Sequence, residues 1–512
     1  MSQSTDNNSL SPAGYFERNW PFVLVLMLLP AAAVRFYGLD LPFDADYMTQ
    51  RLLFASLDLK DILLHNYPDQ RHPQLFYLLM HPVVLLGRQE WLVRLPAAVI
   101  SMVTPVVAFF FLRARLGAAR ALAAAAVVGF SWEFLRHSRD VSDVSLFITL
   151  ALLNCLLLLK AHGRPSRSSL GALVAAQTAM FYSYYLSLLV LVAEVLALFW
   201  QQRAEKNVPR RLWLALGVSV ALAAPAWVDF AGLVLADMKT RQLAAAFPGH
   251  IWGQKGPVEM LGEVAGVLFP AGWEGIVASV ASAAGLVALL VSRADAWKRL
   301  VLCNLAVGAA AIVASVMVVR MQPYYFLYLL PFIAAAALCR TEVNRTGILS
   351  GVAGFLFKAS PVLVAAAFCM DCYVRLPALT SAAGRDHFAR LQEFCRDPDA
   401  PDTIVVDPDM LHTIVLYYCF DDPLAAYRGC RWQNGPVECG HGARRLVTLT
   451  AMASMTEGWQ QRAVERFEAI ARQPVLFVYT EKFENPPLLG QLRERCREVE
   501  KMPPLVVFLC GK

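Results

Sequence analysis

The sequence predicts a polytopic α-helical membrane protein of about eleven transmembrane helices, with a C-terminal extracytoplasmic α/β domain. Of its 512 residues, 57% are hydrophobic and only 17% are charged, whereas soluble globular chains hold roughly 45–50% and 25%. The mean hydropathy is +0.47. The apolar residues form runs close to the ~20 residues that a membrane-spanning helix needs, and only the last part of the chain lacks them. These observations exclude a simple soluble enzyme.

The predicted membrane helices begin at Trp20, after a polar N-terminal segment. Because no small-residue cleavage pattern follows the first apolar run, we expect a retained helix and not a cleaved signal peptide. The spans are predicted near residues 20–34, 91–112, 119–135, 143–160, 169–184, 185–201, 211–233, 273–292, 299–319, 321–339 and 346–370. The run 72–86 is too short to cross a bilayer, so we expect an interfacial or re-entrant helix there.

Lys and Arg residues gather in alternate loops, and such loops face the cytoplasm. A cytoplasmic N-terminus places on the inner side Arg113, Arg115, Arg120, Lys160, Arg164, Arg167, Arg203, Lys206, Arg210, Arg211, Arg293, Lys298, Arg299, Arg340 and Arg345. The predicted domains are a transmembrane domain, 1–370, with outer loops 38–90 and 234–272, and an extracytoplasmic domain, 371–512. Because the basic residues form no single patch, we expect no nucleic-acid partner.

The C-terminal domain shows short β-like runs that alternate with helical patterns. The runs are 403–407, 445–449, 474–479 and 505–509, and the helical patterns are 382–396, 457–473 and 487–500. This alternation predicts a small α/β domain.

Eight of the 11 cysteines lie at or after Cys369, which suits an oxidising extracytoplasmic compartment and disulfides. Cys430–Cys439 and Cys496–Cys510 are candidate local bridges, although the spacing does not fix the connectivity. A zinc site is disfavoured, because no C-x-x-C pair has a second pair at finger spacing.

Polar residues beside membrane spans are costly and are therefore the first candidates for function. Asp44 and Asp46 follow the first helix, where two carboxylates could serve as a general base or hold a divalent cation; an ordinary solvated loop also contains Asp. Arg139 and Asp143 lie between two spans, and Asp143 also suits a helix N-terminus for dipole reasons.

Two further candidates have equally plain structural explanations. His72 and Gln74 flank a Pro that fits the first turn of the interfacial helix. Arg320 stands alone at an outer helix end, where it could bind a phosphate or extend toward lipid headgroups.

Five segments occur in the order found in a known family: Arg35–Asp46, His72–His81, Arg94–Pro96, Arg113–Gly117 and Phe181–Leu189. In this order the chain resembles the GT-C glycosyltransferases, particularly the branch of the protein O-mannosyltransferases and the lipid A aminoarabinose transferase. The resemblance covers about the first 200 residues. The chain departs from the family pattern at Ala45, where a second acid is replaced and Asp46 follows one position late, and at Gln74, which replaces a second Pro.

The resemblance implies a membrane enzyme that moves a sugar from a polyprenyl-phosphate donor to an envelope glycolipid, glycan or protein acceptor. Transfer is expected at the extracytoplasmic face of the cell membrane, by single displacement with inversion. The implied catalytic residues are Asp44, as the base, with Asp46 and Asp143. The implied substrate-binding residues are His72, Gln74, Arg139, Tyr184 and Arg320, the last neutralising the phosphate. No metal ligand is assigned, and a divalent metal ion stays open as a cofactor.

Two other functions fit the same hydropathy. A non-catalytic scaffold of the same fold would keep the helices and lose the role of the acids, and the altered Asp44–Asp46 segment keeps this alternative open. A lipid or sugar transporter is disfavoured, because the sequence has no inverted repeat and no matching pair of Gly/Pro-broken helices.

Overall fold

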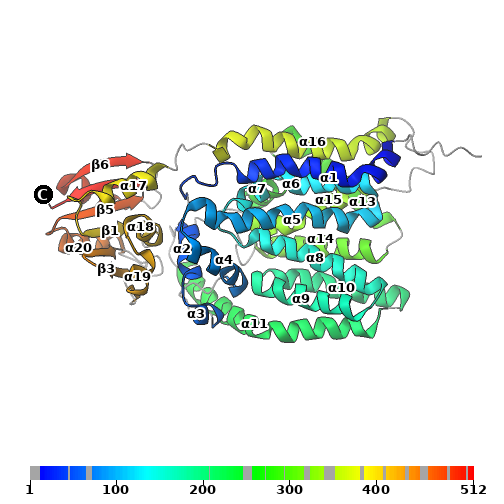
Figure 1. Ribbon diagram of the computed structural model, residues 1–512, viewed down its shortest axis with the longest axis horizontal. Coiled ribbons are helices and arrows are strands. Elements are labelled where there is room, and N and C mark those ends of the chain that lie inside the picture. Colours follow the sequence, from blue (N-terminus) through cyan, green and yellow to red (C-terminus); the bar gives the residue numbers. More distant parts are fainter. Residues whose placement is uncertain are drawn as a thin grey trace, which may run out of the picture.

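The computed structural model describes residues 12–43, 46–64, 72–206, 208–245, 257–270, 272–292, 295–315, 323–339, 352–380, 386–407, 411–432, 437–449, 459–480, 485–502 and 505–511. A long bundle of helices stands beside a smaller sheet domain, and short helices lie between the two (Figure 1). The helical part comprises α1 (Pro12–Phe36), α2 (Asp46–Ala55), α3 (Leu59–Leu63), α4 (Gln74–Leu86), α5 (Glu90–Leu116), α6 (Ala118–Phe130), α7 (Trp132–Ser138), α8 (Val144–Gly163), α9 (Arg167–Ser183), α10 (Ser187–Glu205), α11 (Arg210–Ala245), α12 (Pro257–Leu268), α13 (Trp273–Val291), α14 (Ala296–Ala314), the 3-10 helix η3 (Pro323–Leu329), α15 (Leu330–Ala337) and α16 (Val352–Thr380).

Within the described residues, eight helices are long and apolar enough to cross a membrane, or nine if α6 and α7, which meet at a bend of 58°, form one span. The predicted count of eleven is therefore not confirmed. Predicted span 169–184 corresponds to α9, which has only 17 residues. Predicted span 321–339 is divided between η3 and the eight-residue α15, where Pro residues disfavour one continuous helix.

A buried carboxylate ties four helices of the bundle together. Glu194 of α10 is fully buried. It accepts hydrogen bonds from Asn154 Nδ2 of α8 at 2.6 Å and from Gln177 Nε2 of α9 at 2.9 Å. Ser219 of α11 in turn donates to Gln177 Oε1 at 2.6 Å. Polar side chains that meet in this way hold helices together where lipid offers no hydrophobic driving force.

The C-terminal domain is built on a seven-stranded sheet of order β2-β3-β4-β1-β5-β7-β6, with β4, β1 and β5 parallel and the outer pairs antiparallel. Its elements are α17 (Asp386–Arg396), β1 (Thr403–Asp407), α18 (His412–Cys419), α19 (Pro423–Arg428), β2 (Arg431–Trp432), β3 (Val437–His441), β4 (Arg444–Thr448), α20 (Trp459–Ile470), β5 (Val475–Thr480), α21 (Pro486–Arg495), β6 (Cys496–Met502) and β7 (Leu505–Cys510). Side chains alternate across β1, as strand geometry requires. Ile404 and Val406 face the cluster that contains α18, and Val405 faces α20 and α21.

The sequence analysis misplaced one element of this domain. The helical pattern 487–500 ends at Arg495, and the following residues form the edge strand β6. The chain becomes extended there because Cys496 pairs with Cys510 of the neighbouring β7 through both the ladder and a disulfide.

Three disulfides join the late cysteines. The expected bridges Cys430–Cys439 and Cys496–Cys510 are present, and Cys395–Cys419 is a third. Cys369 and Cys372, on α16, are free thiols.

One hydrophobic cluster contains residues of both the bundle and the sheet domain. Phe43, Met48 and Leu52 from the first loop and α2 are buried in the same cluster as Ile414 and Val415 of α18. In Figure 1 helices α2, α3 and α4 lie at the end of the bundle that faces the sheet domain. Phe43 and the apolar face of α2 therefore lie between the two parts of the molecule.

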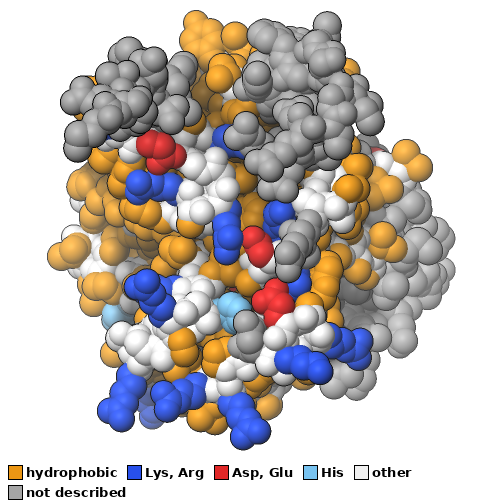
Figure 2. Space-filling view, turned by 90° about the vertical axis from the view of Figure 1, so that its right-hand side faces the viewer, with side chains coloured by type: hydrophobic (Ala, Val, Ile, Leu, Met, Phe, Trp, Pro, Cys, Tyr) orange, Lys and Arg blue, Asp and Glu red, His pale blue; other side chains and the backbone are white. Residues whose placement is uncertain are grey.

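The opposite end of the bundle carries many exposed Lys and Arg side chains (Figure 2). The loops that meet at that end include the α5–α6, α8–α9 and α10–α11 connections. At the end that faces the sheet domain, four arginines are buried, namely Arg35, Arg51, Arg94 and Arg139, whereas Arg88 and Arg136 are exposed. Lys and Arg side chains are thus exposed to the surroundings at the far end of the bundle, whereas these four arginines contact other groups of the protein.

Candidate functional site

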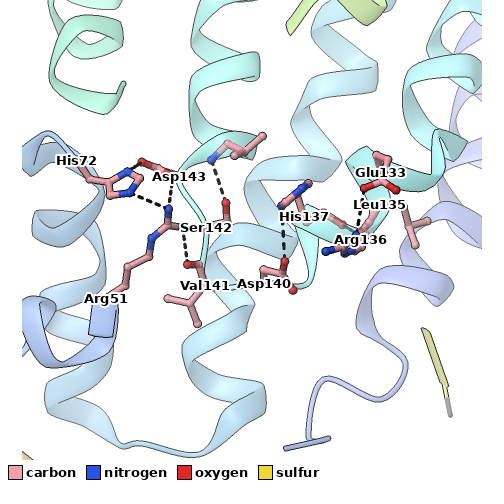
Figure 3. A network of polar contacts seen from close by, with 12 residues as sticks. Arg51, His72, Glu133, Leu135, Arg136, His137, Asp140, Val141, Ser142 and Asp143 are labelled. Carbon is pink, nitrogen blue, oxygen red and sulfur yellow. Dashed lines mark hydrogen bonds and ion pairs between the residues drawn. The ribbon is translucent and has the colours of Figure 1, made fainter. Parts of the chain in front are cut away.

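Three side chains, Arg51, His72 and Asp143, meet (Figure 3) at the end of the bundle that faces the sheet domain (Figure 1); Arg51 and Asp143 are buried, and His72 is partly exposed. Arg51 comes from α2, His72 from the turn before α4, and Asp143 from the residue before α8. Asp143 is 1% exposed. Residues more than 90 positions apart in the sequence therefore meet at one point.

The carboxylate of Asp143 is held from two sides. Arg51 Nη2 lies 3.1 Å from Asp143 Oδ1, and His72 Nδ1 lies 2.8 Å from Asp143 Oδ2. Arg51 also donates to the Val141 carbonyl at 2.8 Å, and its Nη2 lies 3.3 Å from His72 Nε2. These contacts fit a histidine ring that carries its proton on Nδ1 and accepts at Nε2.

The position of Asp143 before α8 does not explain the contacts that its side chain makes. An Asp at this position ordinarily accepts a hydrogen bond from the backbone of the first helical turn, but Asp143 makes no such bond. Burial opposes its ionisation, yet the charge of Arg51 and the contacts with His72 outweigh burial and hold the pKa of the Asp143 carboxyl below its ordinary value. Arg51 and His72 thus favour the charged form of the buried Asp143 carboxyl.

Arg139 and Arg94 fix the loop that follows α1. Arg139 Nη2 donates to the carbonyls of Tyr37 at 2.6 Å and of Gly38 at 3.1 Å. Arg94 Nη1 donates to the Leu39 carbonyl at 2.7 Å and also to that of Leu41, and its Nη2 donates to that of Pro42 at 3.2 Å. Arg139 therefore holds the backbone that precedes Asp44.

An aromatic group borders His72. The Tyr184 ring lies 6.3 Å from the His72 ring and stacks on Phe147 at 5.0 Å. Tyr325 of η3 meets Tyr184 edge to face at 5.6 Å, and Tyr324 lies 4.7 Å from the His137 ring. The substrate-binding residue predicted at Tyr184 is therefore brought next to the site.

Gln74 is buried at the start of α4, two residues after His72. Its side-chain oxygen Oε1 has no hydrogen-bond partner among the described residues. A buried amide oxygen without a partner is costly. It is thus suited to accept a hydrogen bond from a bound molecule.

Three of the predicted site residues fall wholly or partly outside the described residues. These are Asp44 and Arg320, and Asp46, whose backbone begins α2 but whose side chain is not described. The other predicted site residues are all described, and they lie at helix ends on one side of the bundle: Asp143, His72, Gln74, Arg139 and Tyr184.

Arg51 is the principal site residue that the sequence analysis missed. It directly precedes the apolar run Leu52–Ala55 of α2, whose side chains are buried. A positive charge next to such a run is a signal for a buried ion pair, but the sequence does not indicate which residue is its partner.

The described donor set around Asp143 does not fit a divalent cation. Arg51 already supplies positive charge to this carboxylate, and His72 approaches it with an N–H group. Among the described residues, no group of three or more His, Cys, Asp or Glu side chains could hold a metal ion.

Comparisons with known proteins give a consistent result. Residues 71–228 match the sequence model of the family described as dolichyl-phosphate-mannose-protein mannosyltransferase. This range contains all five of the described site residues predicted from the sequence. A comparison with curated protein sequences finds no match.

Three solved structures resemble this chain over most of its length. Apo ArnT from Cupriavidus metallidurans has a TM-score of 0.59 at 14% identity and covers 96% of this chain and 98% of its own. ArnT bound to undecaprenyl phosphate has a TM-score of 0.58 at 16% identity and covers 95% and 97%. The apo oligosaccharyltransferase from Archaeoglobus fulgidus has a TM-score of 0.53 at 14% identity and covers 90% and 69%. These likenesses confirm the fold expected from the order of the sequence motifs.

Proposed function

This chain has the GT-C fold of membrane glycosyltransferases, and we propose that it transfers a sugar from a polyprenyl-phosphate donor to an envelope glycolipid, glycan or protein acceptor. The observation that carries this proposal is the Arg51–His72–Asp143 group, in which the carboxylate of Asp143 is buried. Two of its three members lie in the segment that matches the mannosyltransferase family. A purely structural helix start would not require a buried carboxylate turned away from its own helix.

The proposed reaction is a single displacement. The acceptor hydroxyl oxygen forms a bond to the anomeric carbon, and the bond from that carbon to the phosphate oxygen breaks, its electron pair leaving on polyprenyl phosphate. The hydroxyl proton passes to the base. Because a glycosyl phosphate is already activated, the protein chiefly positions the acceptor, removes this proton and neutralises the leaving phosphate.

We assign different roles to the acids. Asp44 is the proposed base, and Asp46 assists it. Asp143 is less suited to accept a proton, because its carboxylate is already paired with Arg51 and His72 and its pKa is held low. Its proposed role is to position Arg51 and His72 toward the donor.

The proposed substrate contacts come from the residues around this group. Gln74 offers an unpaired amide oxygen, and Tyr184 offers an aromatic edge beside His72. Arg139 supports the loop before Asp44. Arg320 is proposed to neutralise the leaving phosphate.

We propose that the sheet domain and this site lie outside the cell membrane and that the N-terminus lies in the cytoplasm. Two observations support this orientation. Exposed Lys and Arg side chains gather at the opposite end of the bundle (Figure 2), as cytoplasmic loops do. Three disulfides join strands and helices of the sheet domain, which suits an oxidising compartment.

The test is sugar transfer by purified protein from a panel of polyprenyl-phosphate donors, with wild type, Asp44→Asn and Asp46→Asn compared. Asn keeps the volume and removes the proton acceptor, so Asp44→Asn should reduce transfer by roughly 100-fold. Asp46→Asn should cost less. If a cation bridges the two acids, both losses should be similar and chelator-sensitive.

Exposed Glu438, which pairs with Arg445 at 3.0 Å on the sheet domain, provides the control. Glu438→Gln should transfer sugar like wild type. Normal transfer by a folded Asp44→Asn protein would refute the assignment of the base. Donor binding by wild type without any transfer would favour the scaffold.

A further inference from the structure

The loop before Asp44 is held by the sheet domain as well as by the bundle. The backbone N–H of Phe43 donates to the Tyr418 hydroxyl at 3.0 Å. The same hydroxyl donates to Glu90 Oε1, at the start of α5, at 3.3 Å. Phe43 is fully buried and Tyr418 is 6% exposed. One side chain of α18 thus connects the first loop to α5.

Other contacts seat the same helix. The Tyr417 ring meets the Phe43 ring at 5.4 Å, and the Tyr417 hydroxyl donates to the Arg88 carbonyl. Thr413 accepts from Thr49 of α2 at 3.3 Å. Helix α18 therefore contacts the chain on both sides of the Asp44–Ala45 segment, at Phe43 and at α2.

The C-terminal end of α18 is itself fixed. The disulfide Cys395–Cys419 joins it to α17. Arg444 of β4 donates to the carbonyls of both cysteines. The tyrosines that face the bundle are consequently attached to a cross-linked part of the sheet domain and not to a free loop.

From these contacts we propose that Tyr418 is a positioning residue for sugar transfer. It fixes the backbone of Phe43, which directly precedes the proposed base Asp44 in the sequence. The sheet domain therefore holds the residue next to the proposed base. This inference rests on the proposed function, because it needs Asp44 to act in transfer.

The matched pair of variants is Tyr418→Phe and Tyr479→Phe. Each removes one buried hydroxyl that accepts a backbone N–H at 3.0 Å, from Phe43 in the first case and from Asn485 in the second. Tyr479 is on β5, where its hydroxyl bonds within the sheet domain. Both variants keep the aromatic ring, so the loss of packing is the same in kind.

The experiment measures steady-state transfer and amide hydrogen exchange on full-length protein. Tyr418→Phe should lower kcat about tenfold at unchanged KM for the donor, because the donor contacts stay intact. Exchange of the Phe43 amide should rise by tenfold or more. Tyr479→Phe should change neither quantity.

Wild-type kcat in Tyr418→Phe would overturn the proposal, whether or not exchange at Phe43 rises. If Tyr418→Phe does not fold, the wild type decides: slow exchange of the Phe43 amide supports the contact, and exchange at the rate of an exposed amide refutes it. If the wild type transfers no sugar, the proposed function fails, and the exchange data alone still decide whether Tyr418 holds the loop.

Discussion

The buried carboxylate of Asp143 has a helix start within reach and pairs with Arg51 and His72 instead. Taking two charges out of water is expensive, and close contact between them offsets this only if both partners are present. Removal of one partner therefore costs more than the intact pair contributes. The intact pair therefore contributes little net stability, and its main effect is to fix the positions of Arg51 and His72.

We expect Asp143→Asn to lower the free energy of unfolding by about 3 kcal/mol, because it leaves the buried Arg51 without its counter-charge. Transfer should fall at least tenfold as Arg51 and His72 lose their positions. Thermal unfolding in detergent and the transfer assay measure the two effects. The control Glu438→Gln breaks an exposed pair and should cost less than ~1 kcal/mol. Equal stability of both variants would contradict the expected ion pair.

The acid sensitivity of this pair has a definite sign. The folded-state pKa of Asp143 lies below the ordinary 3.8, so its contribution is fully present above that pH and is lost as pH falls through the folded pKa. The difference in Tm between wild type and Asp143→Asn should stay constant from about pH 7 to about pH 5 and shrink below about pH 3.8. A difference that grows on acidification would mean that the pKa is raised.

The sequence located most of the described site residues but not their geometry. Asp143 and His72 lie in recognisable motifs, and their local patterns also fit plain structural roles. Arg51 is recognisable only as a charge beside a short apolar run, because its partner lies 92 positions later in the chain. Pairing across that distance depends on tertiary packing, which local periodicity does not encode.

Among the secondary-structure elements, the edge strand β6 depends on its attachment to β7. Its residues Cys496–Met502 include four charged side chains and do not alternate strictly, and the preceding α21 has no break in its pattern that marks the change. The helical expectation there failed because a cross-strand partner overrides local propensity. By contrast, β1 and β5 are continuous apolar runs in the middle of the sheet, which is why the sequence predicts them.

We expect the double variant Cys496→Ser/Cys510→Ser to lose about 2–3 kcal/mol of domain stability, since the bridge closes a loop with a sequence separation of 14. Chemical denaturation of the full-length protein, monitored through cleavage of β6 by a protease, measures this loss. Reductant should destabilise the wild type more than the double variant. Identical midpoints for both proteins would show that the ladder with β7 suffices.

At the scale of the whole molecule, the two ends differ in where the disulfides and the exposed basic side chains lie. The disulfides lie in the sheet domain, and the exposed basic residues of Figure 2 lie at the far end of the bundle. This distribution predicts which end faces the cytoplasm, and labelling with a membrane-impermeant reagent can test the prediction.

Two engineered thiols test that orientation. Ala443→Cys places a thiol in the exposed turn between β3 and β4, and Ser168→Cys places one at the exposed start of α9. A membrane-impermeant maleimide should label Ala443→Cys in intact cells and Ser168→Cys only after permeabilisation, with the unmodified chain as background. The reverse pattern would invert the proposed topology.

The contact between Phe43 and Tyr418 joins residues 375 positions apart. A ribosome releases the first loop long before α18 exists, and chains fold during synthesis from the N-terminal end. The bundle can therefore assemble while the loop before Asp44 still lacks its last support. A chain that ends just before residue 418 would contain the described membrane helices but would lack the tyrosine that binds the Phe43 backbone. Assembly of the site therefore depends on synthesis of the C-terminal domain.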